Sequence, residues 1–415
     1  MSINSIFNFV VLLFAPLAVL HAAEAMPPIV GDGIHDDTDG IQAILDQRTS
    51  TVYLAPPPKC YLISRTLKLH SRQTLRLDRF TVIRLAPKSD CLMLANDEQN
   101  KGNTDIAVNG GIWDMDNVRQ SSNPFLQILG GKGTYDAGRY LGICMRFINV
   151  EHLSLKEITF RDPVTFCTQL ARLRYFTVDD ITFDYCHANP EPGFNMDGIH
   201  LDGGCRFGRI TNLKGRSNDD LLAINADDGD NESPCFGAIE DIAVDGIYAE
   251  DCHSAVRLLS CGSPVRRITI SNVYGTYYQY AIGLTKFFQG RPAAGMFDDI
   301  TLRDLHCAKA PRYARYQKEK TRVYPVIFVE QNVEVGRLSV EHFHRREEAW
   351  AVPGIEIAKG AKVNTLQISH YTTDNQLPDP LDAIVNSGAV GTLIMEDVTN
   401  NKGGILVDHG RVDRK

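Results

Sequence analysis

The stretch FTVDDITF, residues 176–183, decides the fold, because copies of its pattern recur along the chain. Each copy reads apolar, any residue, apolar, two polar or small residues, apolar. Apolar residues two positions apart face one side of a β-strand, and Asp, Asn, Gly and His between them favour turns. The copies are LSLKEITF at 153, FTVDDITF at 176, ITNLKG at 210, IAVDGI at 242, ITISNV at 268, ITLRDL at 300, LSVEHF at 338, LQISHY at 366 and LIMEDV at 393.

The spacing of these copies indicates a solenoid, since each begins 23 to 38 residues after the last and holds only short strands. No 3.6-residue periodicity runs through the units, which argues against helical repeats. The recurring Asn of leucine-rich repeats is also absent. We therefore predict an all-β, right-handed parallel β-helix over residues 26–415, with one coil per repeat and loops of varied length.

Ahead of the repeats, GDGIHDDTDGIQAILDQ (31–47) predicts a short capping helix. Thr38 or Asp39 is a suitable N-cap, and Ile41, Ile44 and Leu45 form one apolar face. A solenoid needs its open first coil covered, and an amphipathic helix does this. We expect this segment to serve folding.

Residues 1–25 are typical of a cleaved signal peptide, with the apolar run FNFVVLLFAPLAVL before Ala23-Glu24-Ala25. The alternative is a membrane anchor, but a spanning helix needs about 20 apolar residues. We expect a secreted or periplasmic protein that is monomeric and has no stable membrane association after cleavage. The net charge of -8 argues against a nucleic-acid partner.

The sequence predicts no metal site and no cofactor. The ten cysteines form no CxxC pair or His/Cys cluster suited to zinc, and most fit as small core residues, although export permits disulfides. The acidic stretch 227–232 fails the EF-hand template, because Ser233 and Ile239 stand where Gly and Glu are needed. An irregular calcium site and a solvated loop both remain open there.

Three aspartates are candidates for catalysis. Asp197 precedes Asp219 and Asp220 by 22 and 23 residues, which is about one coil. Because neighbouring parallel strands lie about 4.8 Å apart, the three carboxylates should cluster. Mutual repulsion then raises the pKa of at least one of them, which places a proton donor beside ionised acceptors, as glycosidic cleavage requires. Adjacent residues of a strand face opposite sides, so Asp219 and Asp220 can act together only at a bend.

These residues carry a resemblance to a known family. GDGIHDDTDGIQAIL resembles the N-terminal signature of pectin-degrading β-helix enzymes. NMDGIH (195–200) and NDD (218–220) resemble the paired motifs of polygalacturonase-type glycoside hydrolases, family 28. The resemblance implies that Asp219 is the general acid and that Asp197 and Asp220 position water for inversion. The coil spacing alone, with carboxylates about 5 Å apart, instead fits retention.

The same resemblance names further residues within 195–286. It implies that His253 tunes the acid and that Lys286 binds a substrate carboxylate or hydroxyl, with Asn195 in the first motif. The family's Arg-Ile-Lys motif falls on Leu284-Thr285-Lys286, so its arginine is missing, and Arg257 is a candidate replacement. His200 fits either the groove lining or a strand surface. The alternative roles are a turn residue for Asp197 and for His253, and a surface lysine for Lys286.

We therefore predict a secreted glycoside hydrolase that cleaves an acidic, pectin-type polysaccharide, either a galacturonan or a rhamnogalacturonan. A polysaccharide lyase on the same scaffold is one alternative, and it would need calcium and an Arg or Lys base. A non-catalytic glycan-binding solenoid is the other.

Overall fold

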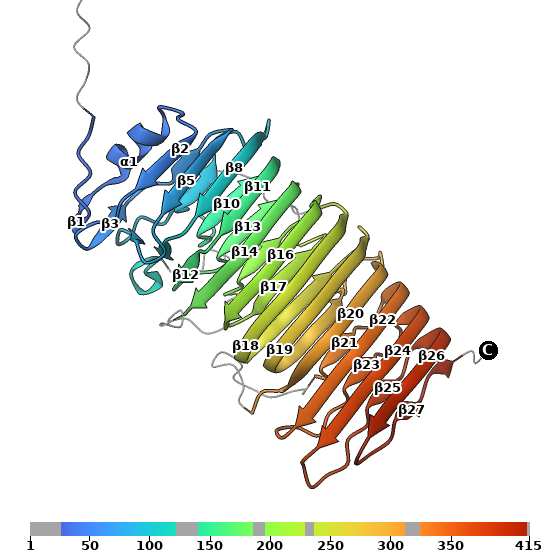
Figure 1. The fold of residues 1–415 in the computed structure, drawn as a ribbon. Helices are drawn as coiled ribbons and strands as arrows, with labels where there is room; N and C mark the ends of the chain where they lie inside the picture. Colours follow the sequence, from blue (N-terminus) through green and yellow to red (C-terminus); the bar gives the residue numbers. More distant parts are fainter. Residues whose placement is uncertain (1–25, 122–139, 186–195, 229–235, 312–323, 413–415) are drawn as a thin grey trace, which may run out of the picture.

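The computed structural model describes residues 26–121, 140–185, 196–228, 236–311 and 324–412. These residues wind into an elongated right-handed parallel β-helix, with the N-terminal coils at one end and the C-terminal coils at the other (Figure 1). The predicted fold class is thus confirmed. The predicted leader, 1–25, lies outside the described residues. Among the helices of the described ranges, none has the length and apolar character needed to span a bilayer.

Hydrogen bonds between successive coils build three columns of parallel strands. One column, which carries the candidate acids, continues in the last parts of β18 and β19. Its separate strands are β4 (Leu67–Leu69), β7 (Leu94–Asn96), β10 (Met145–Ile148), β13 (Thr168–Ala171), β15 (Ile199–Leu201), β17 (Asp220–Asn225), β21 (Ile327–Val329), β23 (Ile355–Ile357), β25 (Ile384–Asn386) and β27 (Leu406–Asp408).

The other two columns begin with separate strands at the N-terminal end. One comprises β1 (Asp32–Asp36), β3 (Cys60–Ile63), β6 (Val82–Leu85), β9 (Ile112–Asp114) and β12 (Thr159–Arg161). The other comprises β2 (Thr51–Leu54), β5 (Gln73–Leu77), β8 (Asn103–Asn109), β11 (Val150–Lys156) and, at the far end, β28 (Arg411–Val412). A 3-10 helix spans Asn117–Arg119.

From the middle of the chain onward, long bent strands cross from one column into the next. They are β14 (Arg174–Asp184), β16 (Arg206–Gly215), β18 (Ile239–Leu259), β19 (Val265–Thr285), β20 (Gly295–Lys309), β22 (Val333–Glu347), β24 (Lys362–Asn375) and β26 (Ala389–Asn400).

The core consists of apolar side chains that stack at the same register position on successive coils. Leu155, Val178, Ile210, Val244 and Ile270 are paired in this order from β11 to β19, and all are fully buried. Each aliphatic side chain removed from water in this way contributes about 1.5–3 kcal/mol. The repeat pattern read from the sequence is therefore the inward face of the solenoid.

The coils begin earlier than the repeat in the sequence. The structure already has complete coils in residues 32–105. The strands from β2 to β7 are only three to five residues long. Strands this short do not show the apolar pattern in the sequence. One repeat is also displaced. The copy assigned to residue 210 starts at Gly208, which pairs with Phe176 and Ile242. A Cβ at Gly208 would lie 2.1 Å from the Phe176 ring, so glycine replaces the first apolar residue.

The polar positions between the apolar residues form bends, as the sequence predicts. Residues at equivalent places in successive coils adopt left-handed backbone conformations, which turn the chain between columns while the ladder continues. They are Asp180, Asn212, Gly246, Asn272, Asp304, His342, His370 and Asp397.

The N-terminal helix α1 spans Thr38–Leu45, and Ile41 and Leu45 are fully buried against the first coils, as predicted for a cap. The proposed N-cap is wrong. The helix begins at Thr38, so Asp37 is the N-cap residue, and its side chain makes no cap hydrogen bond.

The carboxylate of Asp37 is used between strands instead. It accepts hydrogen bonds from the backbone N–H groups of Val30 at 2.6 Å and of Leu62 at 3.1 Å. A buried carboxylate satisfied by backbone donors of two segments ties the incoming chain to the next coil. Asp37 therefore occupies the N-cap position for a tertiary reason.

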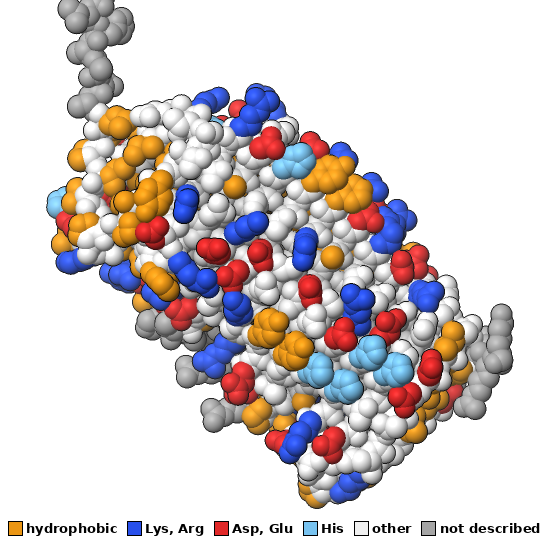
Figure 2. All heavy atoms as spheres, in the orientation of Figure 1, with side chains coloured by type: hydrophobic (Ala, Val, Ile, Leu, Met, Phe, Trp, Pro, Cys, Tyr) orange, Lys and Arg blue, Asp and Glu red, His pale blue; other side chains and the backbone are white. Residues whose placement is uncertain are grey.

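Ring side chains also stack on the outer surface along the solenoid axis. Tyr248 stacks on Tyr274, Tyr274 on His306 and His306 on His344, with ring centroids 4.9 to 5.4 Å apart. Histidines gather on this face beside hydrophobic side chains (Figure 2). The rings cover one another's faces and leave mainly their edges to solvent. This ladder follows from the coil spacing.

The cysteines of the described ranges are free thiols, and most lie buried in the core as expected; they are Cys60, Cys91, Cys144, Cys167, Cys205, Cys252, Cys261 and Cys307. Cys186 and Cys235 lie outside the described residues.

Candidate active site

The three candidate aspartates lie on neighbouring coils of one column. Asp197 precedes β15, and the backbone N–H of Gly198 donates to the carbonyl oxygen of Asp220 at 2.9 Å. Asp220 is the first residue of β17, and Asp219 lies in the bend just before it. The bend removes the strand alternation that would have sent these two neighbours to opposite faces.

His253 extends this group from the next coil. Its Nδ1 lies 3.2 Å from Asp219 Oδ1, and ligand atoms of Asp219, Asp220 and His253 lie within 4.8 Å of one another. The Asp219 side chain keeps 15% of its surface exposed, whereas that of Asp197 is fully buried. Asp219 is therefore the carboxylate of this set that an approaching sugar reaches first.

The three carboxyl groups have different proton affinities. Burial, and then the charge of Asp219, raise the pKa of Asp197 to about 7. Burial also acts on Asp219, but the adjacent His253 outweighs it and lowers the pKa. Burial raises the pKa of Asp220 against the opposing charge of Arg257. A protonated carboxyl beside an ionised one is the equipment of general acid and base catalysis.

Arg257 forms a buried ion pair with the same group. Its Nε lies 2.8 Å from Asp220 Oδ2, and its guanidinium carbon is 5.9 Å from the ring centroid of Phe287. The Nε–Oδ2 contact lacks hydrogen-bond geometry, so its attraction is Coulombic. Arg257, chosen on sequence position alone, thus lies beside the acids.

His200, on β15, contacts one of the three acids. Its Nδ1 is 2.8 Å from Asp197 Oδ2, and its ring stacks on Phe166 with centroids 4.1 Å apart. Only 1% of its side chain is exposed. The other oxygen of Asp197, Oδ1, is buried without a hydrogen-bond partner among the described residues. That oxygen is an acceptor for an enclosed water molecule.

Lys286 is buried, and its Nζ donates to the carbonyl oxygen of Arg291 at 2.6 Å. The ammonium group thus closes the turn that follows β19. The burial of Lys286 is explained without a substrate, and its predicted role in substrate binding remains untested. Asn195 lies outside the described residues.

The solvated-loop interpretation of the second acidic half is wrong for Asp227. This residue is buried, and its Oδ2 accepts hydrogen bonds from the backbone N–H groups of Cys261 at 2.9 Å and Ser263 at 2.7 Å. The backbone of the next coil supplies these donors, which explains why a charged residue is buried here. Asp230 and Glu232 lie outside the described residues.

Asp202 escaped sequence reasoning, and Asp228 was considered only as part of the acidic stretch 227–232. Both contact Nε2 of His200, at 3.3 and 3.2 Å. Asp202 stands two residues after His200, a spacing that places both on one face of a strand, and this signal was available. The position of Asp228 depends on how the chain turns after β17, which no local pattern reveals.

A polar hollow of about 520 Å³ lies elsewhere on the solenoid. It is lined by residues of β11, β14, β16, β18 and β19, including Lys156, Arg209 and Asp245. None of the candidate acids borders it, so it is separate from the site.

Solved structures confirm the class of fold that these coils define. An endo-xylogalacturonan hydrolase from Aspergillus tubingensis is similar over 92% of this chain and 98% of its own, with 11% identity and a TM-score of 0.59. The family 28 exopolygalacturonase of Yersinia enterocolitica is similar over 93% of this chain and 76% of its own, with 13% identity and a TM-score of 0.51.

The fold alone does not select a function. Gene product 12 of bacteriophage phi29, in its pre-mature form, is similar over 93% of this chain and 55% of its own, with 12% identity and a TM-score of 0.55. No family model matches the chain, and no curated protein matches its sequence. These likenesses establish the parallel β-helix, and the chemistry has to be argued from the site.

Proposed function

We propose that the protein is a glycoside hydrolase that cleaves an acidic polysaccharide outside the cytoplasm, using Asp197, Asp219 and Asp220. The supporting observation is the convergence of these three carboxylates and His253 on adjacent coils. Hydrolysis of a glycosidic bond needs one group to protonate the leaving oxygen and another to activate water or attack the sugar. The cluster contains groups for both tasks. Two of the similar folds belong to galacturonan-type hydrolases, which agrees with this proposal.

In the proposed mechanism Asp219 protonates the leaving oxygen, because it keeps exposed surface where a sugar can touch it. His253, 3.2 Å away, orients this carboxyl. Asp197 and Asp220 hold the attacking water, whose hydrogen bond the unpaired Oδ1 of Asp197 accepts, and the ionised carboxylate of these two takes the proton that the water loses. Attack by a held water gives inversion at the sugar carbon.

Because the pKa of Asp219 is lowered in the absence of substrate, this carboxylate must take up a proton from solvent as the sugar binds. Covering the carboxylate with a sugar removes water and raises its pKa, which favours the acid form. The same step brings the leaving oxygen within reach. Protonation of Asp219 on binding is therefore part of the proposal.

The proposed substrate class rests on the motif resemblance and on the similar folds of two galacturonan-type hydrolases. Arg257 is the buried cation next to Asp220, and Leu284 occupies the position where the family motif has arginine. A pectin-type chain with alternating neutral and acidic sugars, such as a rhamnogalacturonan, fits this arrangement along with galacturonan itself.

The test is hydrolysis of pectic polysaccharides by the mature protein, followed by reducing-end release and product analysis. We expect Asp219→Asn to lower the rate on a polysaccharide by at least about 100-fold. It should retain far more activity on a glycosyl fluoride of the matching sugar, whose leaving group needs no proton. Asp197→Asn should lose activity on both substrates. Glu396→Gln, an exposed carboxylate on β26 near the C-terminal end of the solenoid, is the matched control.

Two outcomes would overturn the proposal. Products that absorb ultraviolet light, formed only with calcium, would identify a lyase instead. Binding of polysaccharide with equal affinity by wild type and Asp219→Asn, without turnover by either, would identify a glycan-binding solenoid.

A further inference from the structure

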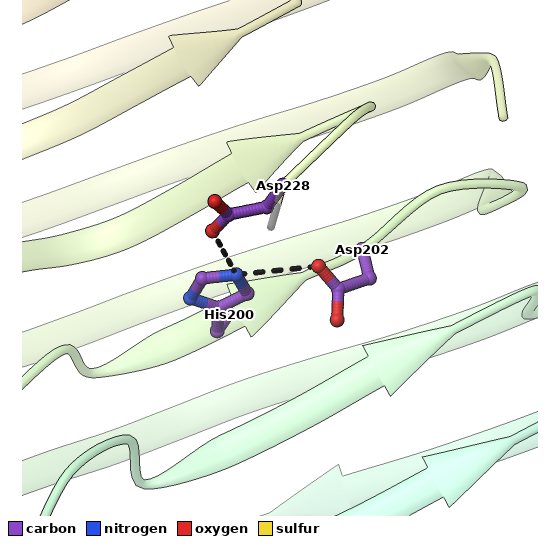
Figure 3. Close-up of side chains that lie close together, drawn as sticks. All are labelled: His200, Asp202 and Asp228. Atoms are coloured by element: carbon purple, nitrogen blue, oxygen red, sulfur yellow. Dashed lines mark ion pairs between the residues drawn. The ribbon is translucent and has the colours of Figure 1, made fainter. Parts of the chain in front are cut away.

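A second cluster of ionisable side chains lies beneath the candidate acids. His200 of β15 faces Asp202 at the end of that strand and Asp228 beyond β17, and the three side chains converge (Figure 3). His200 Nε2 is 3.3 Å from Asp202 Oδ1 and 3.2 Å from Asp228 Oδ2. His200 and Asp202 are each 1% exposed, while Asp228 keeps 22% of its side-chain surface open. The proposed hydrolytic mechanism does not use this cluster.

Three polar side chains surround Nε2 of His200. Besides the two carboxylates, Nδ2 of Asn225 lies 3.3 Å from this ring nitrogen. Asp202, Asp228 and Asn225 thus converge on one buried nitrogen atom.

Asn225 gives a second, independent indication of a ligand. It is fully buried, and its Nδ2 donates to Asp228 Oδ2 at 2.9 Å, so its amide group faces the cluster. Its Oδ1 has no hydrogen-bond partner among the described residues. A half-turn of the amide exchanges the two atoms and directs this oxygen toward Nε2 and Asp228.

The surroundings of the cluster are those of a metal centre. The Nδ1 of His200 contacts the carboxylate of Asp197 at 2.8 Å, and metal-binding histidines characteristically donate this second N–H to a carboxylate. Gln169 Nε2 donates to Asp202 Oδ2 at 2.8 Å and leaves Oδ1 toward the centre. Arg146 Nε in turn donates to Gln169 Oε1 at 2.8 Å. The ring plane is held by the stack on Phe166.

We propose that His200 Nε2, Asp202 and Asp228 bind one divalent transition-metal ion of the Zn²⁺ or Mn²⁺ type, with Asn225 Oδ1 as a further ligand. Metal–ligand bonds of about 2.0–2.2 Å separate neighbouring ligand atoms by roughly 3.0–3.5 Å, which the 3.2 and 3.3 Å contacts match. One imidazole and two carboxylates suit these ions, whereas calcium requires six to eight oxygen ligands. The ion also neutralises the two carboxylates.

The exposed side of Asp228 gives the ion access. Through Nδ1 of His200, the ion fixes the orientation of the Asp197 carboxylate. The site is separate from the Asp219, Asp220 and His253 group, and its occupancy does not depend on hydrolysis. The sequence predicted no metal site, because only the turn after β17 brings Asp228 close to His200 in the folded chain.

The test is metal binding by the full mature protein. Protein treated with a chelator and then dialysed is titrated with Zn²⁺, Mn²⁺ or Ca²⁺ in a calorimeter, and metal content is measured after purification without chelator. We expect about one Zn²⁺ or Mn²⁺ per chain and much weaker Ca²⁺ binding. Co²⁺ loading should give visible absorption bands that His200→Gln changes.

Two variants separate this site from the neighbouring acids. Asp202→Asn should weaken binding by at least about tenfold. Asp219→Asn, the matched control in the other acidic group, should leave binding unchanged. Circular dichroism checks the fold, and if His200→Gln does not fold, Asp202→Asn decides. Failure of both Zn²⁺ and Mn²⁺ to bind stoichiometrically, or unchanged binding by Asp202→Asn, would overturn the proposal. Loss of binding in Asp219→Asn alone would assign the ion to the other group.

Discussion

Replacing Arg257 with methionine tests whether its buried ion pair with Asp220 stabilises the fold. The Arg257 and Asp220 side chains are only 11% and 1% exposed, and their charged atoms lie 2.8 Å apart. Methionine keeps most of the apolar stem and removes the charge. Breaking a buried pair by removing one partner typically lowers the free energy of unfolding by about 3–5 kcal/mol, because the other charge remains buried.

The decrease in the free energy of unfolding should depend on pH, and the direction of this dependence follows from the pKa of Asp220. Burial raises the folded-state pKa of Asp220 above its unfolded value, although Arg257 opposes this. Without Arg257 the folded pKa rises further. As pH increases from the unfolded pKa through the folded pKa, the unfolded state ionises first and stability falls. The destabilisation relative to wild type should therefore be greater at pH 7 than near pH 4, because acid favours the protonated form of Asp220 in both proteins.

The measurement is urea and thermal unfolding followed by circular dichroism at both pH values. Adding Asp220→Asn to Arg257→Met should restore about 2 kcal/mol or more, since the unpaired charge is gone. Arg346→Met is the matched control, because its pair with Glu348 is exposed and screened by solvent, so its loss should leave the free energy of unfolding nearly unchanged. An Arg257→Met protein within about 0.5 kcal/mol of wild type at pH 7 would refute the reasoning.

Two further changes test the coil contacts. Gly275→Ala should abolish soluble expression or lower the melting temperature strongly, because φ is +130° and a Cβ would lie 1.6 Å from the carbonyl oxygen of Ala249. Gly290→Ala is the control, since a Cβ there would have no atom within 4 Å. Equal melting temperatures of the two variants would contradict this expectation. Asp227→Ala should lower the free energy of unfolding by about 2–4 kcal/mol, because it leaves the N–H groups of Cys261 and Ser263 without an acceptor. Unchanged unfolding in urea would show that water replaces the carboxylate.

The sequence by itself determined the fold class and the location of the acids. The apolar alternation in segments such as LSLKEITF directly records which side chains face inward, since side-chain direction alternates along a strand. The polar residues that bend the chain, such as Asp180 and Asn272, are also local signals, because few residues accept left-handed backbone angles. Asp197 and the Asp219/Asp220 pair could be predicted to lie together, because their separation equals one coil.

Only the tertiary structure decided how deeply each side chain is buried and which residues it contacts. The pairing of Arg257 with Asp220, the burial of Asp227 and the meeting of His200, Asp202 and Asp228 all join residues of different coils. Such contacts depend on the register between coils whose loops differ in length. Gly208 shows the limit of prediction from the sequence. Its repeat lacks the first apolar side chain, because the ring of Phe176 in the preceding coil occupies that space. Alternation within a strand determines the face on which a residue lies, and register across coils determines what it meets there.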